Sequence, residues 1–193
     1  MKDEFANRLD ADHVIQQLPP VGGPEHAARN LIEAVEAWTP SDKGGLVMLG
    51  PTGSGKTTAA CHLVRTLLGR YEWATSTAFM IASDLADSEE LVEKAKRVRM
   101  LIIDDLGKEH DRKKRIFRVL DHRHTRYPTV ITCGIKPSDL DQHYDGATIR
   151  RMFEFRGQKV ARVSSFAQTV EKTEPLPVGH TRNPVSFHES AER

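Results

Sequence analysis

Eight consecutive residues have the types and spacing of a phosphate-binding loop. The run Gly-Pro-Thr-Gly-Ser-Gly-Lys-Thr at 50–57 matches the pattern G-x-x-x-x-G-K-[ST] at every fixed position. Glycines let the main chain wrap around a polyphosphate with its N–H groups turned inward, and the start of a following helix adds further free N–H donors. We expect Lys56 to reach the β- and γ-phosphates of a nucleoside triphosphate and the Thr57 hydroxyl to ligate Mg²⁺. The predicted nucleotide-binding residues are Gly50, Pro51, Thr52, Gly53, Ser54, Gly55, Lys56, Thr57 and Thr58.

Two aspartates follow an apolar segment further along the chain. Met100–Ile103 is uniformly apolar and leads into Asp104 and Asp105. Ligands of open α/β sheets bind at the carboxyl edge of the strands, where these two side chains would lie. We expect Asp104 to hold Mg²⁺, through water, because this ion keeps several waters of its own. Asp105 would orient or deprotonate the water that attacks the γ-phosphate. A polar turn is the alternative, but the loop upstream favours the catalytic interpretation.

A third polar residue ends another apolar segment. Thr132 closes the run 129–132 and is followed by Cys133. In ATPases of this loop type that carry an inserted strand, a polar residue here can contact the attacking water or the γ-phosphate. Thr132 is a candidate for that role. An ordinary β-branched strand residue is the equally good alternative.

The segments around these motifs alternate between strand and helix patterns. Short apolar runs predict strands at 46–49, 79–82, 100–103, 129–132 and 159–163. Apolar residues at helical spacing predict helices over 24–38, 56–68, 88–98, 108–127, 138–143 and 147–155. Unbroken apolar strands joined by helices are typical of a mainly parallel sheet covered on both faces. The predicted fold is therefore α/β, a three-layer α/β/α sandwich of the P-loop NTPase type.

Composition is that of an ordinary soluble domain. The 193 residues are 38% hydrophobic and 28% charged, and they hold 28 Lys and Arg against 27 Asp and Glu. The net charge of +1 gives no global argument for a nucleic-acid or membrane partner. No apolar run is long enough to span a membrane, and Cys61 and Cys133 are too far apart to suggest a disulfide framework or a zinc site. We expect a cytoplasmic protein with an irregular segment at 1–23, an ATPase core at 24–163 and a flexible tail at 164–193, where prolines accompany few apolar residues.

Positive charge is concentrated in one segment. Lys108 to Arg126 contains eight Lys and Arg residues and three acidic ones, a local net charge of +5. A helix of this kind could follow a nucleic-acid backbone. A solvated helix face and a subunit interface are the alternatives, since charge runs on helices commonly face water.

At these motifs the sequence resembles the DnaC/IstB group of AAA+ ATPases, which are bacterial and phage helicase loaders and the ATP-binding subunits of certain insertion sequences. The resemblance covers about 24–163. The resemblance rests on these motifs: GGL at 44–46 leading into the loop, IASDL at 81–85, LIIDDLG at 101–107, PTVIT at 128–132 with Asp139-Leu140 downstream, and IRRM at 149–152.

The resemblance implies roles for several residues. It implies a Walker A motif at Gly50–Thr57, a Walker B motif at Leu101–Asp105 and a sensor at Thr132-Cys133, within an AAA+ core that has a reduced lid. The family usually has Asn at this sensor and a further arginine in the region that here reads SSFAQ at 164–168. An arginine finger, which reaches the γ-phosphate of a neighbouring subunit, is best matched by Arg151, with Arg150 beside it.

The resemblance also implies a function. We expect an ATPase that uses ATP and Mg²⁺, assembles as a homo-oligomer and is slow as a monomer, because the finger comes from a neighbour. Its expected role is to control the loading of a replicative helicase in DNA replication. A transposition ATPase that works with a transposase, a small-molecule P-loop kinase and a nucleotide-gated binding module with little hydrolysis are the alternatives.

Overall fold

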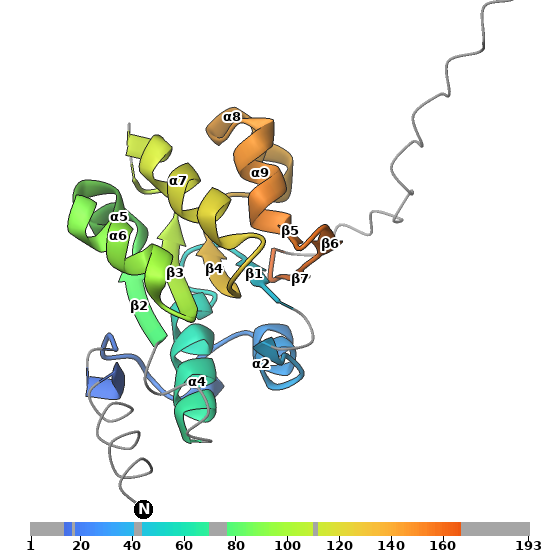
Figure 1. The fold of residues 1–193 in the computed structure, drawn as a ribbon. Coiled ribbons are helices and arrows are strands. Elements are labelled where there is room, and N and C mark those ends of the chain that lie inside the picture. Colours follow the sequence, from blue (N-terminus) through green and yellow to red (C-terminus); the bar gives the residue numbers. More distant parts are fainter. Residues whose placement is uncertain (1–13, 17, 41–43, 70–76, 110–111, 167–193) are drawn as a thin grey trace, which may run out of the picture.

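Five parallel strands form the centre of the molecule (Figure 1). The computed structural model describes residues 14–16, 18–40, 44–69, 77–109 and 112–166. The strands are β1 (Leu46–Leu49), β2 (Thr77–Ile81), β3 (Met100–Leu106), β4 (Thr129–Cys133) and β7 (Ala161–Ser164). They lie in the order β2-β3-β4-β1-β7, and every neighbouring pair is parallel. Strand β4 is thus inserted between β1 and β3, so the carboxyl ends of these three strands meet at one edge.

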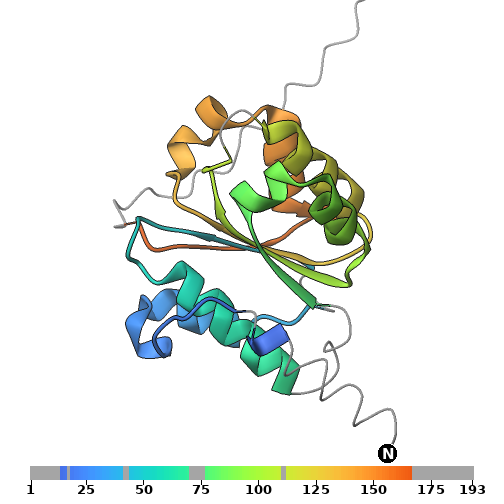
Figure 2. The same cartoon turned by 90° about the vertical axis from the view of Figure 1, so that its left-hand side faces the viewer.

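Helices cover both faces of the sheet, as Figure 2 shows edge-on. On one face lie α2 (Arg29–Glu36) and α4 (Lys56–Gly69); on the other lie α5 (Ala82–Asp87), α6 (Glu89–Arg97), α7 (Lys113–Arg123), α8 (Leu140–His143) and α9 (Gly146–Phe153). Successive strand residues point to opposite faces, so Leu46 and Met48 join the core under α2 and α4, whereas Val47 and Leu49 join the other core. This arrangement confirms the predicted three-layer α/β/α fold.

The helix expected over 24–38 is interrupted. A 3₁₀ turn, η1 (Pro24–His26), precedes α2, and Ala27 and Ala28 between them are extended. The N–H of Ala28 donates to the carbonyl of Ser54 at 3.0 Å. A Cβ on Gly55 would lie 2.4 Å from the Cα of Ala27. The prediction of a continuous helix was wrong because this stretch instead packs against the glycine loop.

Among the described residues of the basic segment, the α-helix runs from Lys113 to Arg123 and does not begin at Lys108 as predicted. Asp105 and Gly107 have positive φ angles of 62° and 110°, and the pairing of β3 with β4 shifts register between Ile103 and Leu106. A bulge of this kind turns the chain sharply at the end of a strand. The helix therefore starts later than its charge pattern indicates.

The carboxyl-terminal part differs in two places. Helix α9 ends at Phe153 rather than Phe155, and a hairpin of β5 (Glu154–Phe155) and β6 (Gln158–Lys159) occupies the start of the strand expected at 159–163. Strand β7 continues to Ser164, and the N–H of Ser165 donates to the carbonyl of Leu49 at 2.8 Å. The chain is thus hydrogen-bonded to the sheet beyond residue 163, where the core was predicted to end. At the other end it packs against the core before residue 24, because Leu18 is buried. Residues 1–13, 17 and 167–193 of the two predicted end segments lie outside the described residues.

None of the helices that the structure describes is long and apolar enough to cross a membrane.

Candidate nucleotide-binding site

The loop at 50–55 joins the end of β1 to the start of α4. Gly53 and Gly55 have φ angles of 84° and 82°, a conformation that side-chain-bearing residues rarely adopt. A Cβ on Gly53 would meet no atom within 4 Å, so this part of the loop faces open space, whereas Gly55 is closed against Ala27. The loop is therefore supported on one side and open on the other, as a phosphate cradle requires.

Lys56 is folded back over this loop. Its side chain is buried, and Nζ donates to the carbonyl oxygens of Gly50 at 2.9 Å and Pro51 at 3.0 Å. Burial lowers the pKa of Lys56, and the nearby carboxylates of Asp105 and Asp104 oppose that shift. An ammonium group that donates to two main-chain carbonyls at the mouth of a glycine loop can exchange them for phosphate oxygens.

Partly buried Thr57 and buried Asp104 and Thr132 form one hydrogen-bond network. The Thr57 hydroxyl lies 2.9 Å from one carboxylate oxygen of Asp104, and the Thr132 hydroxyl donates to the other at 2.6 Å. Burial raises the pKa of Asp104, while the hydrogen bonds from Thr132 and Thr57 hold it down. The structure thus brings together the two residues predicted to bind the metal.

The donor set at this point fits Mg²⁺. A hydroxyl and a carboxylate are hard oxygen ligands of the kind that Mg²⁺ takes together with water and phosphate. Among the described residues no group of three or more His, Cys, Asp or Glu side chains could hold a metal ion by itself. A cation bound by Thr57 and Asp104 would need oxygens from a bound phosphate or water to complete its coordination, which is the usual arrangement for a magnesium nucleotide.

Asp105 lies at the rim of the same site. Its main chain is in the left-handed region, and its side chain is 35% exposed. Its Oδ2 atom pairs with Nζ of Lys108 at 2.6 Å. Lys108 was predicted as part of the basic helix, but it lies beside the carboxylate instead. A pair this exposed is weak, so Asp105 can exchange Lys108 for a water molecule.

The two sensor candidates are both buried. The Thr132 hydroxyl is used within the chain, since it donates to Asp104 and accepts the N–H of Asp105 at 2.9 Å. Cys133 lies beside Leu49 in the sheet, and its Sγ accepts the N–H of Ile135 at 3.4 Å. Thr132 thus orients the two aspartates.

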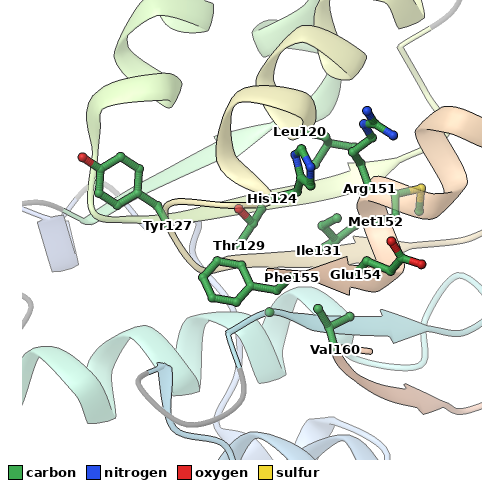
Figure 3. A pocket seen from close by; sticks show the side chains of 11 residues that line it. Leu120, His124, Tyr127, Thr129, Ile131, Arg151, Met152, Glu154, Phe155 and Val160 are labelled. Atoms are coloured by element: carbon green, nitrogen blue, oxygen red, sulfur yellow. The ribbon is translucent and has the colours of Figure 1, made fainter. Parts of the chain in front are cut away.

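The candidate arginine finger lies apart from this network. Arg151 is largely buried on α9, where Nε donates to Asp121 of α7 at 2.7 Å and the guanidinium stacks on Phe117. Figure 3 shows it beside Leu120 and Met152, lining a pocket. Arg150 is 61% exposed, and its nearest carboxylate, on Glu154, is 3.9 Å away.

Two residues near the site were not predicted. Glu109 is buried and accepts the N–H of Gly107 at 2.8 Å, and the hydroxyl of Tyr144 donates to its other oxygen. Burial and the Glu109 hydrogen bond raise the pKa of Tyr144. The pair ties the turn after Asp105 to the end of α8. In the sequence, an acidic residue two positions after Gly107 is only a weak signal for this contact. Its partner Tyr144 is 35 residues further along the chain, so no local pattern links the two.

Most of the positive charge of the segment Lys108–Arg126 is used within the chain. Arg112 pairs with Asp87, and Arg115 and Arg118 both pair with Glu89. The most buried member, Arg123, is 1% exposed and donates to the carbonyls of Ala95, Val98 and Pro128. These side chains attach α7 to α5, α6 and the loop before β4 rather than forming a free cationic face.

Comparison with known proteins places this chain in an NTPase family. The family model described as Novel STAND NTPase 3 matches residues 28–133, which include the glycine loop and both aspartates. The Replication factor C small subunit of Methanopyrus kandleri is 27% identical over 145 residues, which are 75% of this chain but 21% of that protein. The chain therefore spans about a fifth of the length of this curated relative.

Solved structures share the fold at low sequence identity. The crystal structure of DnaI aligns with a TM-score of 0.56 and 20% identity over 79% of this chain and 93% of that one. AMPPCP-bound DnaA from Aquifex aeolicus aligns with a TM-score of 0.50 and 17% identity over 79% and 50%. A primosome component from Streptococcus pyogenes serotype M3 aligns with a TM-score of 0.51 and 20% identity over 74% and 84%. These likenesses confirm the expected α/β/α fold.

Proposed function

The chain belongs to the Novel STAND NTPase 3 family, and from that premise we propose that it binds ATP with Mg²⁺ at residues 50–58 and hydrolyses it. The observation that carries this proposal is the network in which Thr57 and Thr132 share the Asp104 carboxylate beside the glycine loop. A hydroxyl, a buried carboxylate and a lysine at the mouth of that loop form the minimal set for a magnesium triphosphate.

Each residue then has a separate task. The loop N–H groups and Lys56 bind the phosphates, and Lys56 exchanges the carbonyls of Gly50 and Pro51 for phosphate oxygens. Thr57 and Asp104 hold Mg²⁺, which neutralises phosphate charge when it is bound. Asp105 exchanges Lys108 for the attacking water and accepts its proton. Thr132 keeps both aspartates in place through its two hydrogen bonds.

A neighbouring subunit completes the site in this proposal. An arginine from a second copy supplies positive charge at the γ-phosphate, a contribution worth about 10³–10⁵ in turnover. Sequence favours Arg151 for this role, but its guanidinium is bound to Asp121 and Phe117, whereas Arg150 is exposed. We therefore assign the arginine finger to Arg150. Arg151 instead attaches α9 to α7 through its pair with Asp121. Turnover would then rise with protein concentration.

The biological setting proposed is DNA replication, in which ATP turnover controls the loading of a replicative helicase. Support comes from the names of the similar proteins, which are a Replication factor C small subunit, DnaI, DnaA and a primosome component. The match with DnaI covers 93% of that chain, which makes it the most complete of these comparisons. In this setting the partner is a helicase hexamer.

Nucleotide binding and turnover test the proposal separately. We expect ATP with Mg²⁺ to raise the melting temperature of the protein, and Lys56→Ala to abolish that response. Asp105→Asn should still bind ATP and lose phosphate release, because it removes only the group that positions water. Failure of purified protein to respond to ATP or ADP with ample Mg²⁺ would overturn the nucleotide site.

Co-purification from cells with mass spectrometry tests the partner. A replicative helicase bound in the presence of ATP supports helicase loading. A transposase in its place would support the transposition ATPase. Release of phosphate that requires a small acceptor would support a kinase.

A further inference from the structure

Four exposed cations surround the β5–β6 hairpin, and the nucleotide site uses none of them. We name Arg126, Arg156, Lys159 and Arg162 the hairpin patch. Arg126 follows α7, Arg156 is in the turn of the hairpin, Lys159 is in β6 and Arg162 is in β7. Figure 1 shows β5, β6 and β7 together at the edge of the sheet.

Main-chain hydrogen bonds bring these segments together. The N–H of Arg156 donates to the carbonyl of His124 at 2.8 Å, and its Nη2 atom lies 3.4 Å from the carbonyl of Arg126. The Arg162 guanidinium lies 5.9 Å from the centre of the Phe153 ring, at the point where α9 runs into the hairpin. Figure 3 shows His124 and Tyr127 on the same pocket as Glu154 and Phe155. The end of α7 therefore packs directly against the hairpin.

The charges of the hairpin patch are not neutralised by acids of the described chain. No carboxylate in that part of the chain lies within 4.0 Å of the four cationic groups. Glu154, which is opposite Lys159 in the hairpin, is nearest to Arg150 instead. The cations of α7 differ, since Arg112, Arg115 and Arg118 pair with acids of α5 and α6. Like charges gathered without a counter-charge attract an external anion.

The turn of the hairpin holds an arginine where the main chain favours other residues. Arg156 and Gly157 have φ angles of 51° and 76°, which is the geometry of a type I′ turn. Asn, Asp or Gly is preferred at the first of these positions. The Arg156 guanidinium stacks on Phe155 with 5.1 Å to the ring centre, which fixes its position. An exposed arginine kept at this left-handed position, without an acidic partner in the described chain, favours a role for the side chain itself.

The side chains of the hairpin patch are of the types that bind the phosphate backbone of a nucleic acid. Arg and Lys side chains bind phosphodiester oxygens without reading sequence. Base stacking needs an open aromatic face, and the Phe155 ring packs against Gly44, where a Cβ would lie 2.2 Å from it. We propose that the hairpin patch is a binding surface for the phosphodiester backbone of DNA. The choice of DNA among polyanions rests on the proposed role in replication.

The hairpin patch lies at the opposite edge of the sheet from the nucleotide. Strand β7 begins at Ala161, which pairs with Leu46 at the start of β1, whereas the glycine loop follows Leu49 at its end. DNA and ATP can therefore be bound at the same time. Neutralising the patch should leave nucleotide binding and basal turnover unchanged.

Fluorescence anisotropy with labelled DNA tests the proposal, in one series with a duplex and in another with a single strand, without nucleotide. With four phosphate contacts, the slope of log affinity against log salt should be about −3 to −4 for the duplex and about −3 for the single strand. The variant Arg156→Gln/Lys159→Gln/Arg162→Gln should lose about tenfold or more in affinity at low salt, and its slope should flatten by about two to three. The series with the tighter binding identifies the form of DNA.

A matched control removes three exposed cations elsewhere. The variant Lys94→Gln/Arg97→Gln/Lys114→Gln removes two positive charges from α6 and one from α7, the same total as the hairpin variant. It should bind DNA as the wild type does. The single variant Lys159→Glu should weaken binding as well, which guards against loss of folding in the triple variant. Equal binding by wild type and hairpin variant, or equal loss in the control, would overturn the proposal. The thermal shift with ATP is read in parallel, so failure of the nucleotide site and failure of the hairpin patch are distinguished.

Discussion

The hydroxyl of Thr132 lies 2.6 Å from Oδ1 of Asp104, at the centre of the proposed nucleotide site. The hydroxyl oxygen of Thr132 also accepts the N–H of Asp105 at 2.9 Å. One side chain of β4 thus fixes both aspartates of β3, the one proposed to hold Mg²⁺ and the one proposed to position water. The insertion of β4 beside β3 is what makes this contact possible.

Thr132→Val should weaken the use of Mg²⁺. Valine has the same shape but leaves the Asp105 N–H and one Asp104 oxygen without this partner, and such outer contacts of a metal ligand are worth about 10–100-fold in affinity or activity. A magnesium titration of ATP turnover measures the effect. Thr132→Ser keeps the hydroxyl and should stay close to the wild type. An unchanged magnesium requirement in the valine variant would remove Thr132 from the site.

The two arginines of α9 should have opposite phenotypes. Arg151→Ala loses the Asp121 pair and the Phe117 contact, and should lower the free energy of unfolding by about 1 kcal/mol. Arg150→Ala should leave stability within about 0.5 kcal/mol and lower turnover of the assembled protein by a factor of about 10³ or more. Urea unfolding and concentration-dependent phosphate release measure the two effects.

Mixing variants tests whether Arg150 acts on a neighbour. Arg150→Ala subunits keep an intact loop, and Asp105→Asn subunits keep an intact arginine, so mixed oligomers contain some complete sites. Turnover in the mixture well above that of either variant alone is expected. A mixture no more active than its parts would mean that Arg150 does not act between subunits.

The sequence predicts this site well where the signal is local. Residues 50–57 are contiguous, and Asp104 and Asp105 directly follow the apolar run Met100–Ile103, so their types and spacing suffice. The link between Glu109 and Tyr144 joins residues 35 apart, and no pattern along the chain indicates it. The charge of α7 was misleading for the same reason, because its partners Asp87 and Glu89 lie on other elements. The hairpin patch is likewise assembled from four segments.

Arg123 should be a stability residue rather than a binding residue. Burial lowers its pKa to about 9, which is still above neutral pH, so the guanidinium is charged and satisfied by main-chain carbonyls. Arg123→Met leaves several buried carbonyls without donors and should cost about 3 kcal/mol of unfolding free energy. Arg123→Lys has one nitrogen donor in place of the planar guanidinium, so its unfolding free energy should lie between those of the wild type and Arg123→Met. Urea denaturation measures the series, and a methionine variant as stable as the wild type would contradict it.

The two cysteines should be inert in the folded protein. Both thiols are buried, and burial raises the pKa of Cys61 and of Cys133 from 9.0 to about 11. Because the thiolate is the reactive form, its population at pH 8 is about a hundredfold lower in the folded than in the unfolded chain. Between about pH 9 and about pH 11 the folded state keeps protons that the unfolded state loses, so these thiols make stability fall as pH rises through that window. A colorimetric thiol reagent at pH 8 should react slowly with the native protein. In urea it should react fast, and two thiols per chain should be modified. Rapid native reaction of one equivalent would show that a thiol is accessible, and the variants Cys61→Ala and Cys133→Ala would identify which one.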